Sequence, residues 1–148
     1  MCRYAMGVYK RRYACFACRK SFKRRTPGDV GHRGPERPAL CPQCGLLMAD
    51  MGRDFEPPAR GDERGWTAAE ALFAVGITFH SCGCSGPGYR PRDPRELRAF
   101  FLEMRVHYQA SLQRWRADER AAPEVRAGAA SLWQARLAAL DAALAADG

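Results

Sequence analysis

The chain has 148 residues, of which 47% are apolar and 27% are charged, a balance typical of a globular protein and not of a disordered one. No apolar run approaches the roughly 20 residues that span a bilayer, and the first residues lack the apolar stretch of a signal peptide. We therefore expect a cytoplasmic protein. In that reducing compartment the seven cysteines indicate metal ligands or reactive thiols rather than disulfides.

The net charge of +8 is concentrated near the start of the chain. Residues 1–28 hold nine basic side chains and no acidic one, whereas the remaining 120 residues hold 15 basic and 16 acidic side chains. A concentrated positive field attracts a polyanion, and nucleic acid is the usual one. The charge pattern therefore predicts a nucleic-acid partner for the N-terminal part.

Residues 1–56 form the first predicted unit, a basic zinc ribbon. Short strands are expected at residues 13–16 and 21–24, on either side of a tight turn. Residues 26–38 are rich in Gly and Pro and predict a loop. A second tight turn follows at residues 41–45, and residues 46–55 are expected to be a strand or extended chain.

Residues 57–92 are predicted to form a small unit that packs on the ribbon. Residues 56–65 are expected to be a polar linker. Thr67 and Glu70 have the spacing of a capping box, which predicts a helix over residues 68–75 that ends at Gly76. Residues 77–80 are expected to form a short strand, and a turn-rich loop follows.

Residues 93–148 are predicted to form an antiparallel helical hairpin, which makes the whole chain an α+β protein. Asp93 and Glu96 form a capping box with Pro94 at the first helical position, and Pro123 begins a second helix. Apolar residues recur at steps of three and four along both helices. The expected seam places one set against another: Leu97, Phe101, Met104, Tyr108 and Trp115 against Leu132, Leu137, Leu140 and Leu144.

Two Cys-x-x-Cys pairs separated by 22 residues match the pattern of a tetrathiolate zinc site. Two residues between thiolates make a tight turn whose amide groups point at the sulfur atoms, and a redox dithiol needs only one such pair. A closed four-thiolate site has no position for water, so it predicts one structural Zn²⁺; iron, which also binds soft thiolates, is the alternative. The second turn ends in Gly45 where the first has Arg19, which predicts a less regular first turn. The predicted ligands are Cys15, Cys18, Cys41 and Cys44.

Residues 13–45 resemble a zinc ribbon, the rubredoxin-like fold of many ribosomal proteins and transcription factors. Residues 41–45, 48–55 and 79–91, with Trp66, also resemble a group of short bacterial zinc-ribbon proteins. The resemblance covers residues 13–91 and implies the fold of this part. It implies no particular activity.

The first metal turn lies between two basic segments that alternate with the aromatic residues Tyr9, Tyr13, Phe16 and Phe22. Cations contact phosphate, and exposed aromatic rings stack on unpaired bases. The alternative is a solvated basic face with these rings buried in a small core, and we expect burial for Phe16 and Phe22. The predicted phosphate contacts are Lys10, Arg11, Arg12, Arg19, Lys20, Lys23, Arg24 and Arg25.

His80, Cys82 and Cys84 would share one face of an extended chain. Three such ligands and a water form a catalytic metal site, but the glycines around them favour a compact loop with buried thiols.

The sequence thus favours a non-catalytic zinc-ribbon module that binds nucleic acid, with structured RNA or the ribosome ahead of DNA. The alternative is a protein–protein adapter that docks through the helical hairpin, and a metal- or thiol-dependent enzyme is third. An adapter should expose apolar residues of the hairpin. An RNA-binding module should place Arg11, Arg12, Arg24 and Arg25 on one continuous face, and an enzyme should bring His80, Cys82 and Cys84 together.

Overall fold

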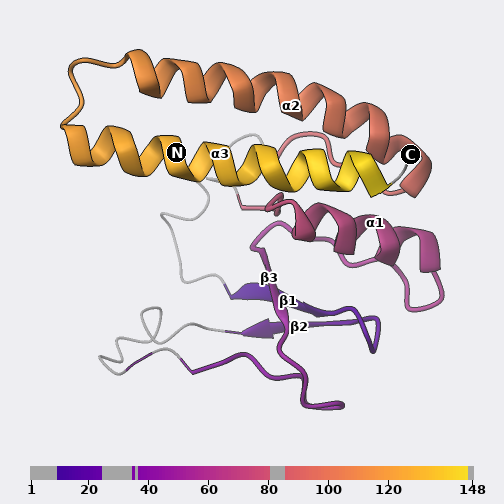
Figure 1. The fold of residues 1–148 in the computed structure, drawn as a ribbon. Helices are drawn as coiled ribbons and strands as arrows, with labels where there is room; N and C mark the ends of the chain where they lie inside the picture. Colours follow the sequence, from indigo (N-terminus) through magenta and orange to yellow (C-terminus); the bar gives the residue numbers. More distant parts are fainter. Residues whose placement is uncertain (1–9, 25–34, 36, 81–85, 147–148) are drawn as a thin grey trace.

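The computed structural model describes residues 10–24, 35, 37–80 and 86–146, and it has the expected α+β architecture. Figure 1 shows three layers: a small antiparallel sheet, a short helix above it, and a hairpin of two long helices on top. The four cysteines that the sequence predicts as metal ligands belong to the sheet layer.

The sheet contains β1 (Arg11–Cys15), β2 (Lys20–Arg24) and β3 (Ala49–Gly52) in the order β2-β1-β3. All the pairings are antiparallel. The first two strands confirm the predicted hairpin, and β3 lies within the extended segment predicted at residues 46–55. A bulge in the β1–β3 pairing falls between Arg12 and Tyr13.

Helix α1 (Glu63–Ala74) begins five residues earlier than the sequence predicted. Its N-cap is Asp62, whose carboxylate accepts a hydrogen bond from the Gly65 amide at 3.0 Å. Thr67 is not the cap, because it lies inside the helix and its hydroxyl donates to the Glu63 carbonyl at 2.8 Å. The predicted linker is therefore wrong at its end, since residues 63–65 are helical.

The end of α1 confirms the predicted stop at Gly76, which adopts φ +80°. The Gly76 amide donates to the Phe73 carbonyl and the Ile77 amide to the Leu72 carbonyl, the pattern of a Schellman motif. The strand predicted at residues 77–80 does not form. This segment instead docks on β3 through Phe79, whose amide donates to the Met51 carbonyl at 2.8 Å, and His80 approaches Asp50 on the same strand.

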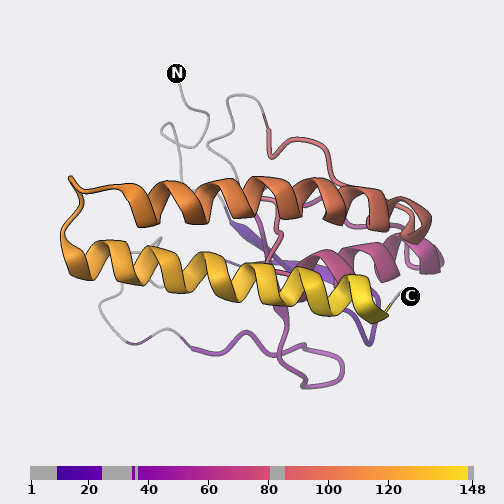
Figure 2. The same cartoon turned by 45° about the horizontal axis from the view of Figure 1, so that its top comes forward.

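Helices α2 (Pro94–Ala117) and α3 (Pro123–Ala146) form the predicted antiparallel hairpin, which Figure 2 shows from a second direction. Asp93 caps α2 and Pro94 occupies its first turn, as expected. The seam is only partly as predicted, because Leu140 is fully buried but Leu132 is 49% exposed. Trp133 takes the place next to Tyr108, with ring centroids 5.2 Å apart. No helix in the described part is both long and apolar enough to cross a membrane.

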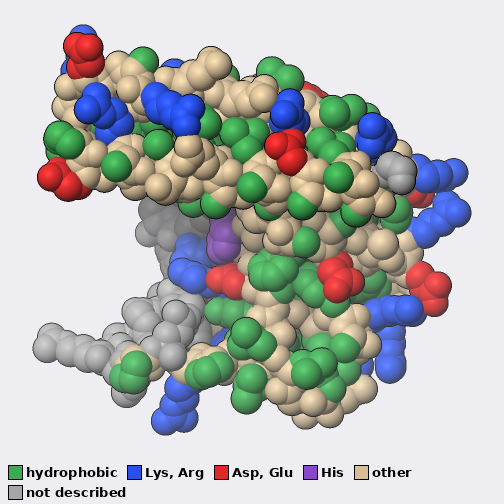
Figure 3. Space-filling view, viewed as in Figure 1, with side chains coloured by type: hydrophobic (Ala, Val, Ile, Leu, Met, Phe, Trp, Pro, Cys, Tyr) green, Lys and Arg blue, Asp and Glu red, His purple; other side chains and the backbone are tan. Residues whose placement is uncertain are grey.

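The surface of the helical hairpin mixes charged and hydrophobic side chains. Figure 3 shows basic side chains spread along the two long helices, with hydrophobic ones between them. Some of the charged groups join the helices, since Arg105 pairs with Asp141 at 2.6 Å and the Arg98 guanidinium donates to the Leu144 carbonyl at 3.4 Å. Polar contacts therefore add to the apolar seam on the exposed side of the hairpin.

The described part of the chain has three core clusters, one around Cys15 and Cys41 and two that share α1. Trp66 and Ala69 pack on the sheet against Ala14 and Met51. The other side of α1 packs under the hairpin, and the buried residues of that cluster are Ala68, Leu72, Val75, Ile77, Leu97, Phe100, Phe101 and Leu140. Helix α1 is thus buried on two faces, which joins the ribbon to the hairpin.

Candidate metal centre

The structure brings the four predicted ligands together at one end of the sheet. One ligand atom from each of Cys15, Cys18, Cys41 and Cys44 lies within 4.8 Å of the other three. The Sγ atoms of Cys15 and Cys44 are 3.6 Å apart, and those of Cys18 and Cys41 are 4.0 Å apart. A tetrahedron with metal–sulfur bonds of about 2.3 Å has edges of about 3.8 Å. The cluster therefore fits one tetrahedrally coordinated ion of the size of Zn²⁺.

The two turns that carry the ligands both end in a residue with positive φ. Arg19 adopts φ +52° and Gly45 adopts φ +76°, each directly after the second cysteine of its pair. The first turn is thus as left-handed at its exit as the second, although its residue there is not glycine. In the second turn the Gly45 amide donates to the Cys41 carbonyl at 2.8 Å, and the Gln43 amide approaches the Cys41 sulfur at 3.4 Å. Amide groups directed at sulfur stabilise thiolates, as a metal site requires.

The pKa values of the thiols indicate how the cluster would respond to a bound cation. Hydrogen bonds from the backbone amides of Cys44 and Gln43 lower the pKa of Cys41 to about 7. The neighbouring Cys44 side chain, together with burial, raises the pKa of Cys18 to about 12, and burial raises the pKa of Cys15. Thiolates as close together as these oppose one another's charge. A bound metal ion removes this opposition and couples its own binding to folding of the ribbon.

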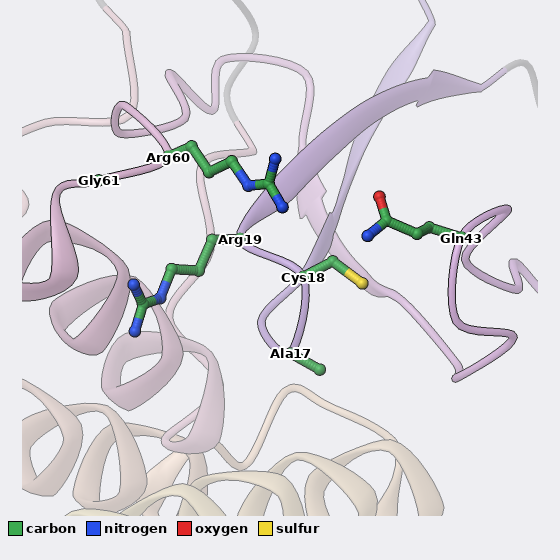
Figure 4. A pocket seen from close by; sticks show the side chains of 6 residues that line it. All are labelled: Ala17, Cys18, Arg19, Gln43, Arg60 and Gly61. Carbon is green, nitrogen blue, oxygen red and sulfur yellow. The ribbon is translucent and has the colours of Figure 1, made fainter.

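A hollow of about 470 Å³ opens beside the first turn. Figure 4 shows the Arg60 guanidinium and the Gln43 amide extending toward each other from opposite sides of the hollow, with the Cys18 sulfur below the Gln43 amide. Arg19 points away toward α1, where it pairs with Glu63 at 3.1 Å. Sequence reasoning missed Arg60 because it lies in the predicted linker, and no local pattern relates it to the cysteines.

The predicted phosphate contacts divide between the two ends of the β1–β2 hairpin. Arg19 and Lys20 lie at the metal end, where the Lys20 ammonium group donates to the Gln43 side-chain oxygen. The other described members lie at or near the opposite end, which we call the free end and define by its residues: Lys10, Arg11, Arg12, Lys23 and Arg24. Arg25 lies outside the described residues.

Cations face each other in pairs across the free end. Arg11 is opposite Arg24, and Arg12 is opposite Lys23. Because side chains alternate along a strand, Arg11 and Arg24 lie on the same face as Cys15, whereas Arg12 and Lys23 lie on the other face. The arginines expected on one continuous face are therefore split between the two faces of the sheet.

The partners of these side chains differ. Arg11 forms an ion pair with Asp50 at 3.2 Å, a carboxylate on β3 that sequence reasoning did not single out. Arg24 donates to the carbonyls of Pro38 and Arg37 at 3.0 and 3.2 Å. Within the described ranges, Arg12 and Lys23 have no carboxylate partner. In the described part of the chain, the free end thus carries five cations, and one carboxylate, that of Asp50, faces it.

The described aromatic residues of the ribbon pack inward. Tyr13 is 7% exposed, and Phe22 packs on the same cluster around Cys15 and Cys41. Phe16 contacts the rings of Trp66 and Phe73, with centroids 6.3 and 6.0 Å away. Phe16 and Phe22 are partly buried and pack against the core, as expected, although neither is fully buried. Tyr9 lies outside the described residues.

The second candidate site consists of His80, Cys82 and Cys84, and of these Cys82 and Cys84 lie outside the described residues. His80 is exposed, and its Nε2 atom lies 3.7 Å from the Asp50 carboxylate. The described part of the adjoining loop contacts its surroundings: Tyr89 donates to Glu96 on α2 at 3.1 Å, and Arg92 pairs with Glu56 at 2.7 Å. These contacts agree with a connector between layers.

The arrangement can hold one metal ion as a structural centre, with zinc the ion that its four thiols suit best. Comparisons of the chain with protein-family models, with curated proteins and with solved structures found no significant match. The features that bear on function are therefore the candidate metal centre and the positive charge of the β1–β2 hairpin.

Proposed function

We propose that the protein is a non-catalytic zinc-ribbon module that binds nucleic acid through the free end of the β1–β2 hairpin. The supporting observation is that two like-charged pairs face each other across the strands: Arg11 is opposite Arg24, and Arg12 is opposite Lys23. Like charges directly opposite each other destabilise a sheet. Their presence at a strand end with a single facing carboxylate in the described part, Asp50, favours a role in attracting an external anion.

The described cations lie on two faces of the sheet and not on the single continuous face expected of an RNA-binding module, so the site that we propose has phosphates on both sides. A hairpin that carries cations on opposite faces can contact two backbone strands at once, as between the walls of a groove. The inward packing of Tyr13, Phe16 and Phe22 disfavours base stacking by these rings. We therefore propose a folded, double-helical target, with structured RNA or the ribosome ahead of DNA. The metal contributes by holding the opposite end of the hairpin rigid.

The test is a salt titration of binding to a short RNA hairpin, a DNA duplex and a single strand. Each phosphate contact contributes about −0.9 to the slope of log K against log salt on duplex DNA. Replacing Arg12 and Lys23 by Ala should reduce the magnitude of the slope by about 1.8, by the same rule. The matched control is Arg114→Ala with Arg116→Ala, which removes two cations from the last turn of α2.

Loss of fold can be separated from loss of contact in this test. Removing Arg12 and Lys23 eliminates a like-charged pair, so the free energy of unfolding should stay the same or rise. Equal affinity and equal salt slope for the parent, the variant lacking Arg12 and Lys23, and the control would contradict nucleic-acid binding at the free end. Tighter binding of the single strand would contradict a double-helical target.

A protein–protein adapter is the second candidate, favoured by exposed aliphatic side chains on the helical hairpin. Leu102 and Val106 are 47% and 65% exposed and lie one turn apart on α2. Val125 and Leu132 are 56% and 49% exposed and lie two turns apart on α3. Aliphatic stripes of this kind occur at protein interfaces. Substituting Val125 and Leu132 by Ser should abolish capture of a protein partner under this alternative and leave nucleic-acid affinity unchanged.

A further inference from the structure

Two cations from different elements lie near the first metal turn: Lys20, which contacts Gln43, and Arg60, which lines the hollow together with Gln43. Lys20 begins β2 and is the direct cross-strand neighbour of Cys15. Opposed side chains in an antiparallel pair lie on the same face with Cβ atoms about 5 Å apart. Lys20 is also held from the second turn, because its ammonium group donates to the Gln43 side chain. Its charge is thus kept next to the ligand cluster.

Arg60 approaches the same place from the segment before α1. Its side chain lines the hollow with Cys18 and Gln43, and Figure 4 shows the guanidinium directed across the opening toward them. No carboxylate in the described part of the chain pairs with Arg60. Arg19 is different, because it points toward α1 and is neutralised by Glu63.

The charge of the centre decides what these cations face. A divalent ion bound by four thiolates leaves two net negative charges on the cluster. Lys20, Arg60 and Arg19 contribute three positive charges, and Glu63 together with the cluster contributes three negative ones. A free anion in the hollow would therefore find no excess of positive charge. This balance favours counter-ions over a receptacle for phosphate.

We propose that Lys20 and Arg60 are the counter-ions of the metal–tetrathiolate centre, and that they raise its affinity for the metal. They act on the ligands through charge and are not ligands themselves. Outer-shell partners of this type commonly change metal affinity by 10- to 100-fold when they hydrogen-bond to a ligand. Lys20 and Arg60 lie at an open surface, where solvent screens them, so we expect a roughly three- to tenfold loss of affinity for each.

The experiment measures zinc affinity by competition with a chromogenic chelator, using the full chain and the variants Lys20→Gln, Arg60→Gln and the double variant. The double variant should bind zinc at least tenfold more weakly than the parent at low salt. The charge-retaining variant Arg60→Lys should restore most of the affinity. The control pair Arg114→Gln and Arg116→Gln makes the same change of net charge at the far end of α2 and should leave the affinity within twofold of the parent.

A second measurement separates a charge effect from damage to the site. The cobalt-substituted proteins should have the same sulfur-to-cobalt absorption spectrum in the parent and in all variants, because the four ligands are unchanged. The difference in zinc affinity should also shrink in 1 M salt, where the screening length falls to about 3 Å. An altered cobalt spectrum, a difference that persists at high salt, or an equal loss in the control pair would each overturn the proposal.

Discussion

Gly52 offers a sharp test of how the segment after α1 docks on the sheet. It lies at the end of β3 with φ +91°, and a Cβ atom there would lie 2.7 Å from the His80 nitrogen and the Phe79 carbonyl carbon. Both are backbone atoms, so the docked segment would have to move by about 0.7 Å to reach ordinary contact. That movement would strain the hydrogen bonds of Phe79 with Met51 and Asp54.

The expected magnitude follows from comparison with Gly76, which has φ +80° and where an added Cβ atom would meet no atom within 4 Å. Alanine in the left-handed region costs about 1–2 kcal/mol at either position. Overpacking adds about 1–3 kcal/mol at Gly52 alone. Gly52→Ala should therefore lower the free energy of unfolding by about 2–5 kcal/mol, and Gly76→Ala by about 1–2 kcal/mol.

The assay is urea unfolding of both variants and the parent in their metal-loaded form, with the slope m compared to ensure that the same surface is exposed. The two substitutions share the backbone penalty, so the difference between them isolates the steric contact. Equal losses would refute the close approach of residues 79 and 80 to β3, and with it the position of His80 beside Asp50.

Three further predictions concern the core, the metal and pH. Leu140→Ala should destabilise the protein by about 2–5 kcal/mol because Leu140 is fully buried, whereas Leu132→Ala should cost less than about 1 kcal/mol; similar losses in thermal unfolding would contradict the observed seam. The parent should contain one zinc ion per chain by elemental analysis, and Cys41→Ser should lose both the ion and the folded ribbon; a variant that folds equally well in chelator would exclude a structural metal. The side-chain and backbone hydrogen bonds from Arg95 lower the pKa of Asp93 to about 2 from 3.8, so its contribution to stability is present above pH 4 and is lost as the pH falls toward 2; Asp93→Asn should flatten the stability profile over this range, and an unchanged acid limb would refute the contribution.

Several features were predictable from sequence because local contacts determine them. The spacing within each Cys-x-x-Cys pair is a local requirement of a tight turn, and the four thiols of the two turns do converge. The same holds for the cap at Asp93, whose partner is two residues away, and for the end of α1 at Gly76. Each of these patterns involves neighbours within one turn of chain, so composition and order suffice to predict it.

The start of α1 could not be predicted in this way. Thr67 and Glu70 have the spacing of a capping box, but Trp66 and Ala69 pack on the sheet while Ala68 and Leu72 pack under the hairpin. Burial on two faces favours a longer helix that is capped by Asp62, begins at Glu63 and includes Trp66 in its first turns. Local propensity is a weak contribution beside this packing.

The state of the basic residues was likewise decided only by the tertiary structure. In the sequence, the first 28 residues form one uninterrupted positive segment. In the fold, Asp50 and Glu63, 39 and 44 positions away from their partners, neutralise Arg11 and Arg19, and the metal centre lies beside Lys20. Sequence alone therefore determined that the excess of basic residues and the four predicted metal ligands belong to the same N-terminal unit. Which cations face solvent and which face the metal depends on long-range contacts, because the energy of a charge is set by its neighbours in space.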